Sequence, residues 1–208
     1  MSVVDELRAG PVVARLRDDR VLAILRGLPP AEVARVADGL QRGGVGAIEV
    51  TLDSPGALDS IRDLAARDGV LAGAGTVRTP AAVDAAVGAG ARFVVAPGFS
   101  AAVVERCLGL GVPAVPGALT PTEIEAAWDA GAALVKLFPG GLGGPRYVAD
   151  VHAPLRDVPL VVTGGVTALN ARAFLDAGAV AVGVGGALGH APDPEAAARE
   201  LADALRTA

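Results

Sequence analysis

The chain has 208 residues, of which 52% are hydrophobic and 3% aromatic, and its formal net charge is −5. This length suits one domain with a sizeable core, and an acidic balance without runs of like charge argues against binding to nucleic acid or an anionic membrane surface. The single cysteine, Cys107, excludes an intrachain disulfide, and the charged first twenty residues, without any membrane-length apolar run, predict a cytoplasmic protein.

The predicted elements begin with a helix and continue as an alternation of strands and helices. Residues 2–17 carry apolar side chains at helical spacing and predict an amphipathic helix. The strands are continuous apolar runs, as expected for a parallel sheet buried on both faces. They are Val21–Leu25, Ala47–Leu52, Val70–Ala72, Phe93–Ala96, Val112–Val115, Ala133–Phe138, Pro159–Val162 and Ala179–Val184. Helices are expected near 30–42, 55–67, 80–88, 100–109, 121–130, 145–153, 168–176 and 193–206.

Local signals support several of these helices. Ser54-Pro55, Thr79-Pro80 and Thr120-Pro121 each place a capping residue before a proline at the first helical position. Glycines follow most of the helical segments, where a left-handed residue often ends a helix.

Eight strands in 208 residues leave about 26 residues for each strand, helix and pair of loops. Right-handed βα units in that number close into a single (β/α)₈ TIM barrel, here with an extra N-terminal helix, and one domain over residues 1–208. A doubly wound open sheet is the alternative. The dinucleotide fingerprint GxGxxG is absent after the first strand, which disfavours dinucleotide binding.

Three successive strands are followed by the same dipeptide. The fourth, fifth and sixth strands are predicted to end in Ala96-Pro97-Gly98, Val115-Pro116-Gly117 and Phe138-Pro139-Gly140. The shared Pro-Gly dipeptide indicates that these three strands end at equivalent positions on the rim formed by the strand C-termini. In barrel enzymes this rim carries the active site.

Lys136 is the only lysine of the chain and lies in the sixth predicted strand, between Leu134 and Phe138. Burial of an ammonium without a partner is costly and lowers the pKa of an amine. A neutral amine is suited to forming a Schiff base with a ketone. The alternative is a lysine that extends its charge to the surface.

Glu49 and Arg26 are the other charged residues of otherwise apolar strands. A buried carboxylate is either paired or used for acid–base chemistry, so Glu49 is a candidate proton shuttle. Arg26 ends the first strand, where a guanidinium can hold a carboxylate at two points or pair with Glu49.

Three glycine-rich turns follow strands. Gly73-Ala-Gly-Thr-Val77 allows close approach of a ligand and offers the Thr76 hydroxyl. Thr163-Gly-Gly-Val-Thr167 and Gly183-Val-Gly-Gly-Ala187 follow the last two strands, where barrels often bind phosphate. The alternative is that these two glycine-rich segments are tight turns without a binding role.

A catalytic metal is not expected. His152, His190 and Cys107 do not have the spacing of a ligand cluster. Asp150 lies two residues before His152, but this pair is interpreted as a solvated helix end.

Together these segments resemble the 2-keto-3-deoxy-6-phosphogluconate (KDPG) aldolases and their 6-phosphogalactonate relatives. The resemblance runs from about residue 20 to 190. It rests on Ala23-Ile-Leu-Arg-Gly27, Ile48-Glu-Val-Thr-Leu52, Gly73-Ala-Gly-Thr-Val77, Val115-Pro-Gly117, Val135-Lys-Leu-Phe-Pro-Gly140, Thr163-Gly-Gly-Val166 and Val182-Gly-Val-Gly-Gly-Ala-Leu188.

The resemblance implies a class I aldolase that uses Lys136 as the Schiff-base lysine and Glu49 as the acid–base group. Such an enzyme needs no cofactor or metal, acts on a small 2-keto acid, forms a homotrimer and belongs to Entner–Doudoroff carbohydrate metabolism. The substrate contacts expected are Arg26 and Thr76 at the carboxylate, Pro116, Phe138 and Thr163 in the pocket, and Gly164, Gly165, Gly185 and Gly186 at the phosphate.

Two positions depart from the family pattern. Asp53 stands where some KDPG enzymes have an arginine, so Arg26 is expected to hold the carboxylate instead, as in the galactonate branch. Gly186 stands where a serine is common, which removes one hydroxyl contact to phosphate. The sequence leaves open the configuration at C4.

The alternatives are the same mechanism on an unphosphorylated or 4-hydroxy-2-oxo acid, a sugar-phosphate isomerase or epimerase, or a non-catalytic barrel that binds sugar phosphates. A metal-dependent epimerase needs His and Asp ligands at strand ends, and the sequence does not supply them.

Overall fold

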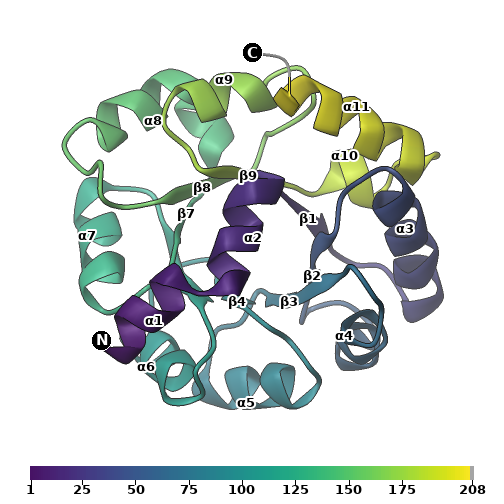
Figure 1. Cartoon of the computed structure of the whole chain (residues 1–208), viewed down its shortest axis with the longest axis horizontal. Helices are drawn as coiled ribbons and strands as arrows, with labels where there is room; N and C mark the ends of the chain where they lie inside the picture. The colour runs from purple at the N-terminus through teal and green to yellow at the C-terminus, as the bar shows by residue number, and fades with distance from the viewer. Residues whose placement is uncertain (207–208) are drawn as a thin grey trace.

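The structure is a computed structural model, and residues 1–206 are described. Parallel strands form one sheet in the order β5-β4-β3-β2-β1-β9-β8-β7-β6, and helices surround it (Figure 1). The strands are β1 Val21–Leu25, β2 Ala47–Thr51, β3 Leu71–Gly75, β4 Val94–Val95, β5 Ala114–Val115, β6 Gly117–Ala118, β7 Val135–Leu137, β8 Leu160–Thr163 and β9 Ala181–Val184. The predicted TIM barrel is confirmed.

Most of the helices lie within a few residues of their predicted ranges. The outer helices are α3 Pro30–Arg42, α4 Ala57–Ala65, α5 Pro80–Gly88, α6 Ala101–Gly109, α7 Pro121–Asp129, α8 Gly144–His152, α9 Ala171–Asp176 and α11 Pro194–Arg206. Two short elements were not predicted, the 3₁₀ turn η1 Gly140–Leu142 and helix α10 Gly186–Gly189. None of the helices in the described part of the chain is long and apolar enough to cross a membrane.

Pro116 interrupts the fifth strand and does not end it, contrary to the prediction. The segment before it, β5, pairs with β4, and the segment after it, β6, pairs with β7, where Gly117 lies opposite Lys136. Proline has no N–H to donate to a ladder, so the hydrogen bonding changes partner at this residue. Its carbonyl still accepts a bond from the N–H of Lys136 at 2.9 Å. The two segments together close the ring of eight βα units.

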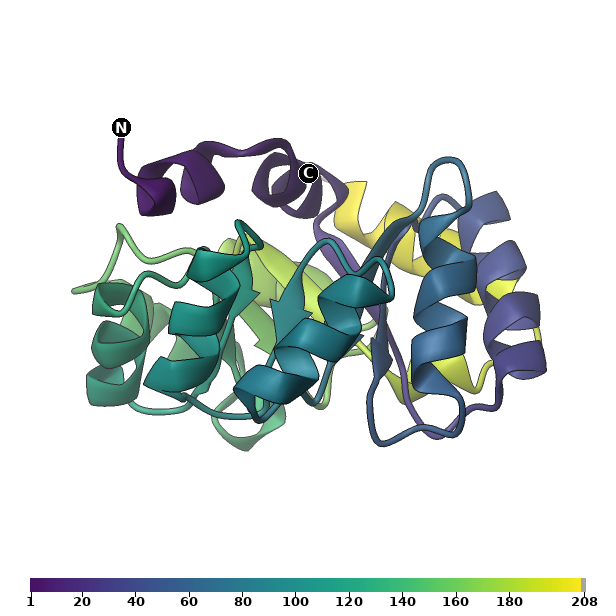
Figure 2. The ribbon, with the colours of Figure 1, turned by 90° about the horizontal axis from the view of Figure 1, so that it is seen from below.

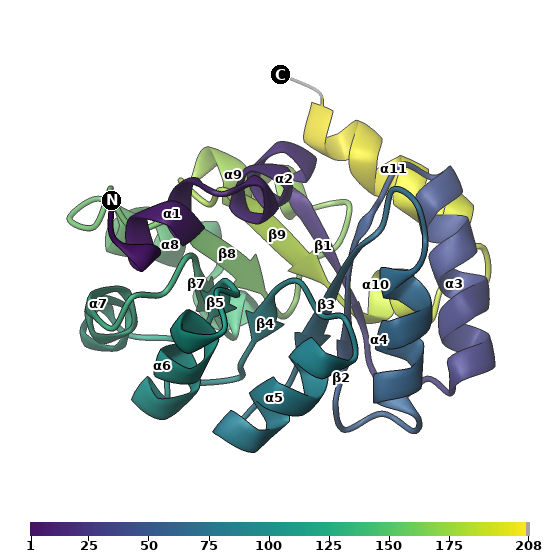
Figure 3. The ribbon, with the colours of Figure 1, turned by 60° about the horizontal axis from the view of Figure 1, so that its bottom comes forward.

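The predicted N-terminal helix is two helices, α1 Val3–Ala9 and α2 Pro11–Asp19. Gly10, between them, has an extended backbone with φ −72° and ψ 164°. The ring of Pro11 disfavours helical geometry at the preceding residue, which explains the break. Figures 1 and 2 show α1 and α2 on one end of the barrel, and Figure 3 shows β8 and β9 running away from them.

The barrel interior at this end is filled by apolar side chains from α2 and from the early positions of the strands. We call this set the inner cluster: Val12, Val13, Leu16, Leu22, Ala47, Phe93, Val95, Val115, Ala133, Leu134, Val161 and Ala181. The alternate positions, such as Ile48, Val135 and Val162, face the helices in a second and larger cluster. Side chains alternate between the two faces of a strand. The residues two positions after inner-cluster members therefore also point into the barrel.

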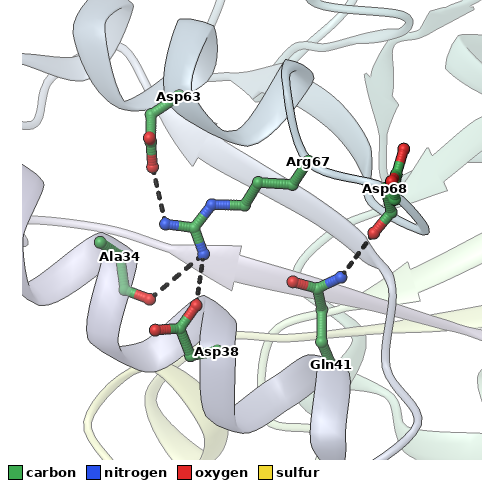
Figure 4. Close-up of polar contacts among 6 residues, drawn as sticks. All are labelled: Ala34, Asp38, Gln41, Asp63, Arg67 and Asp68. Atoms are coloured by element: carbon green, nitrogen blue, oxygen red, sulfur yellow. Dashed lines mark hydrogen bonds and ion pairs between the residues drawn. The ribbon is translucent and has the colours of Figure 1, made fainter.

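Arg67, just after α4, connects two neighbouring outer helices (Figure 4). Its guanidinium bonds Asp63 on its own helix and Asp38 on α3, each at 2.7 Å. Gln41 of α3 also donates to the carbonyl of Asp68 at 2.9 Å. The side chain of Arg67 is 21% exposed, so these bonds are screened less than those of the surface pairs.

Arg67→Ala is expected to lower the free energy of unfolding by about 1 kcal/mol, because it removes the ion pair with Asp38 of α3 together with the local pair with Asp63 of α4. Urea unfolding measures the change. Arg62→Ala is the matched control, because Arg62 is more exposed and pairs only with Asp59 of its own helix. Equal losses in the two variants would contradict a role for Arg67 in holding the helices together.

Candidate active site

A cavity of about 200 Å³ opens at the C-terminal ends of the strands, opposite α1 and α2. Its walls come from β1, β7, β8 and β9 and from the turns that follow them. The lining residues are Ile24, Arg26, Lys136, Phe138, Thr163, Gly164, Gly165, Val166, Gly183, Gly185 and Gly186.

Lys136 projects into this cavity from β7. It lies two positions after Leu134 of the inner cluster, while Val135 and Leu137 face the helices. The residue is 5% exposed, and its Nζ lies 5.2 Å from the ring centroid of Phe138. No carboxylate of residues 1–206 lies within ion-pair distance of the amine. The lysine is therefore buried beside the cavity without a direct counter-ion.

Glu49 occupies the equivalent inward position on β2, two residues after Ala47. It is fully buried, and neither carboxylate oxygen has a hydrogen-bond partner among the described residues. Burial raises the pKa of Glu49 above its usual value, while the charges of Lys136 and then Arg26 act to lower it. A buried carboxyl group with a raised pKa and no hydrogen-bond partner is a candidate for acid–base chemistry.

Glycines leave the space that these two side chains need. A Cβ at Gly75, on β3 beside Glu49, would overlap the Glu49 carboxylate, and one at Gly73 would overlap the Phe93 ring. Gly183 on β9 has the same role, because a Cβ there would meet Thr163 and Ile24. These glycines face inward at the level where Lys136 and Glu49 face inward. The barrel interior is thus filled by the inner cluster on the side of α2 and is open at the level of Lys136 and Glu49.

Arg26, just after β1, lies at the rim of the cavity. Its Nη1 donates to Asp53 Oδ2 at 2.9 Å and its Nη2 to Thr76 Oγ1 at 3.1 Å. Thr76 follows β3 and has a left-handed backbone with φ 58°, which is uncommon outside glycine. The predicted carboxylate-binding pair, Arg26 and Thr76, is therefore in contact, with Asp53 as a third member.

The glycine-rich turns after β8 and β9 form the opposite wall. Gly164 and Gly165 have left-handed φ values of 86° and 77°. The Gly164 carbonyl accepts a bond from the N–H of Gly141 at 2.8 Å, which ties this turn to the one after β7. Helix α10 begins at Gly186, and the first N–H groups of a helix have no helical acceptor.

Eight of the eleven predicted site residues line the cavity, and the other three are not among its lining residues. Glu49 is buried within electrostatic reach of Lys136, Thr76 contacts Arg26, and Pro116 is buried and bonded through its carbonyl to the Lys136 backbone. Ile24, Val166 and Gly183 line the cavity but were not predicted. Ile24 and Gly183 could have been found by counting two positions from Leu22 and Ala181.

Within residues 1–206, no three His, Cys, Asp or Glu side chains lie close enough to hold a metal ion. Thr163, on β8, is buried, and its hydroxyl has no hydrogen-bond partner in that same range. An unsatisfied buried hydroxyl costs free energy, so a group that enters the cavity and bonds Thr163 recovers it.

Comparison with known proteins relates this geometry to one family. The sequence model named KDPG and KHG aldolase matches residues 12–199. A 2-dehydro-3-deoxy-6-phosphogalactonate aldolase of Escherichia coli K12 is 37% identical over 168 residues, covering 79% of this chain and 82% of the relative. A 2-dehydro-3-deoxy-phosphogluconate aldolase of Treponema pallidum is 40% identical over 161 residues, covering 73% and 76%.

Among solved structures, one described as native KDPGal superposes with a TM-score of 0.85 at 35% sequence identity. The match covers 89% of this chain and 94% of the other chain. The likeness therefore extends over the whole barrel and not only over the motifs at its rim.

The burial of Glu49 predicts a pH-dependent effect on stability. Because the folded protein raises the pKa of Glu49, the stability it contributes is present below the unfolded pKa and is lost as the pH rises through the folded pKa. Glu49→Gln should therefore gain stability over the native protein in urea unfolding experiments as the pH rises above the ordinary glutamate pKa of about 4.3. Glu125→Gln, on α7, controls for loss of an exposed carboxylate. A difference in free energy of unfolding between Glu49→Gln and the native protein that stayed constant with pH would refute this expectation.

Proposed function

The chain belongs to the KDPG and KHG aldolase family, and from that premise we propose that it is a class I aldolase acting on a 2-keto-3-deoxy-6-phospho sugar acid. The products are pyruvate and glyceraldehyde 3-phosphate, and the substrate has the gluconate or galactonate configuration. The observation that carries this proposal is the placement of Lys136, the only lysine of the chain, at the buried end of a cavity beside an unpaired, buried Glu49.

The reaction starts at the amine of Lys136. The neutral amine attacks the C2 ketone of the substrate, and the oxygen takes up a proton to give a carbinolamine. Glu49 in its protonated form donates a proton to that hydroxyl, which leaves as water and yields an iminium ion.

The carbon–carbon bond breaks in the second stage. The Glu49 carboxylate removes the proton of the C4 hydroxyl, directly or through one water, and the electrons of the C3–C4 bond move into the iminium. Glyceraldehyde 3-phosphate leaves and an enamine remains. Protonation at C3 and hydrolysis of the resulting imine then release pyruvate and restore the free amine. The raised pKa of Glu49 suits a group that both accepts and donates protons in one cycle.

The remaining residues hold the two ends of the substrate. Arg26 and Thr76 bind the C1 carboxylate through the guanidinium and the hydroxyl, a geometry that bidentate pairing favours. Pro116, Phe138 and Thr163 shape the middle of the pocket. Gly164, Gly165, Gly185 and Gly186 receive the phosphate through backbone N–H groups.

The proposal extends to four further properties that rest on the family resemblance. The protein forms a homotrimer, lies in the cytoplasm, takes part in Entner–Doudoroff carbohydrate metabolism and uses no cofactor besides the covalent bond at Lys136. The 208 residues act as one domain.

An unphosphorylated or 4-hydroxy-2-oxo acid substrate is the second candidate, and one observation favours it. Gly186 provides no hydroxyl at the loop that would receive phosphate. A purely binding role for the barrel is disfavoured, because a buried Lys136 and Glu49 are costly to keep unless chemistry uses them.

Borohydride reduction in the presence of pyruvate is expected to leave one covalent adduct on the protein, visible as a mass increase of the intact chain. Lys136→Ala should give no adduct because the amine is absent. Lys136→Arg should also give none, because the guanidinium stays protonated. An adduct that persists in either variant, or no adduct on the native protein, would exclude a Schiff base at Lys136.

Gly186→Ser is expected to lower the KM for phosphorylated substrate by about tenfold, because a hydroxyl bonded to a charged group contributes roughly 1.5–3 kcal/mol. A Cβ at this position meets no atom of residues 1–206 within 4 Å, so the serine fits. Pyruvate release from 2-keto-3-deoxy acids, with and without phosphate, measures the effect. Gly186→Ala is the control for added bulk. An equal change for both substrate forms would place the phosphate elsewhere.

A further inference from the structure

Asp53 contacts the residue proposed to bind the substrate carboxylate. Arg26 has five N–H donors, and one on each terminal nitrogen is used, toward Asp53 and toward Thr76. Three donors remain for a ligand. Because the two acceptors lie on opposite terminal nitrogens, together they fix the orientation of the guanidinium plane.

The loop that carries Asp53 is itself held against β1. The Ser54 hydroxyl accepts a bond from the N–H of Gly27 at 2.8 Å and lies 3.0 Å from the Thr51 hydroxyl. The first bond joins the turn after β2 to the turn after β1, one residue beyond the Arg26–Asp53 contact in each turn, and the second ties Ser54 to the last residue of β2. Asp53 therefore reaches Arg26 from a fixed backbone and not from a freely moving loop.

The second acceptor is fixed as well. Thr76 adopts its left-handed backbone directly after Gly75, whose carbonyl accepts a bond from the N–H of Leu52 at 2.9 Å. The turns after β1, β2 and β3 are therefore connected in series. Arg26 spans them from the first to the third.

Without Asp53, the long side chain of Arg26 would have one partner and more rotamers. The two side chains of the ion pair are about half exposed, 53% for Arg26 and 47% for Asp53, so their attraction alone adds little stability. The ion pair matters more because it orients the Arg26 side chain. A ligand that binds an already ordered side chain avoids part of the conformational entropy cost of binding.

We propose that Asp53 is a positioning residue that holds the Arg26 guanidinium for the carboxylate of the keto acid. The proposal rests on the proposed function, since it takes that carboxylate to be the ligand of Arg26. The carboxylate binds the N–H donors of Arg26 that Asp53 and Thr76 leave unused. Asp53 itself touches neither the substrate nor the reacting atoms.

The test compares pyruvate with pyruvamide, which has the same ketone but no carboxylate, in borohydride trapping followed by intact mass. Asp53→Ala should raise the pyruvate concentration for half-maximal trapping by about fivefold, the upper end for an exposed pair, with the maximal rate unchanged. Asp53→Asn should stay near the native value, because its amide oxygen accepts the same bond from Arg26. The pyruvamide concentration for half-maximal trapping should be the same in the native protein, Asp53→Ala and Asp53→Asn.

Two further proteins complete the design. Asp59→Ala removes an exposed aspartate from α4, at a distance from the cavity lining, and should change neither ligand. Arg26→Met removes the group that Asp53 positions, so adding Asp53→Ala to it should have no further effect on pyruvate. Thermal unfolding of each variant checks that the barrel is intact, and Asp53→Ser, whose shorter side chain does not reach the Arg26 guanidinium, gives the answer if Asp53→Ala does not fold.

The possible outcomes separate this proposal from the proposed function. Failure of the native protein to trap either ketone overturns both. Trapping by the native protein with equal changes for pyruvate and pyruvamide, or with no change in Asp53→Ala, overturns only the role of Asp53. Tighter pyruvate binding in Asp53→Ala also overturns it, because Asp53 would then be competing with the carboxylate for Arg26.

Discussion

Glu49 and Lys136 place two ionisable side chains in the interior of one barrel. Removing them from water costs free energy, and the packing around them has to offset that cost. A buried carboxylate without hydrogen bonds is unfavourable unless it takes up a proton. The fold supplies the compensating stability through the inner cluster below the pair and the larger cluster outside it. The glycines at 73, 75 and 183 then keep the level of the pair free of competing side chains.

Position along each strand decides whether a side chain serves packing or chemistry. The early inward positions, such as Ala47 and Leu134, belong to the inner cluster, and α2 covers that end of the barrel. Two residues later the inward positions are Glu49 and Lys136, and beyond them the rim carries Arg26. Water and substrate can therefore approach the pair from the rim, while the opposite end stays dry.

Sequence patterns predicted the strands, most helices and the pair of Lys136 and Glu49, because buried parallel strands are apolar and a charge within them stands out. The break at Gly10 was missed although the Gly10-Pro11 dipeptide signals it locally. The change of partner at Pro116 was missed because it depends on which strands lie beside that residue in the closed barrel. The contact of Arg26 with Asp53 was also invisible. It joins residues 27 positions apart, and only the closed barrel brings their turns together.

The two acids on and after β2 show how local environment divides the work of one chemical group. Glu49 and Asp53 are four positions apart, but burial raises the pKa of Glu49, whereas a hydrogen bond from Thr51 and the charge of Arg26 lower the pKa of Asp53. Burial therefore favours the protonated form of Glu49, while Asp53 keeps its charge beside Arg26. An acid that titrated at the rim would release Arg26 whenever it was protonated, and one fixed as a carboxylate inside would be unable to donate. Reversing the two environments would disable both roles, so the depth of each acid in the barrel, and not its residue type, determines what it does.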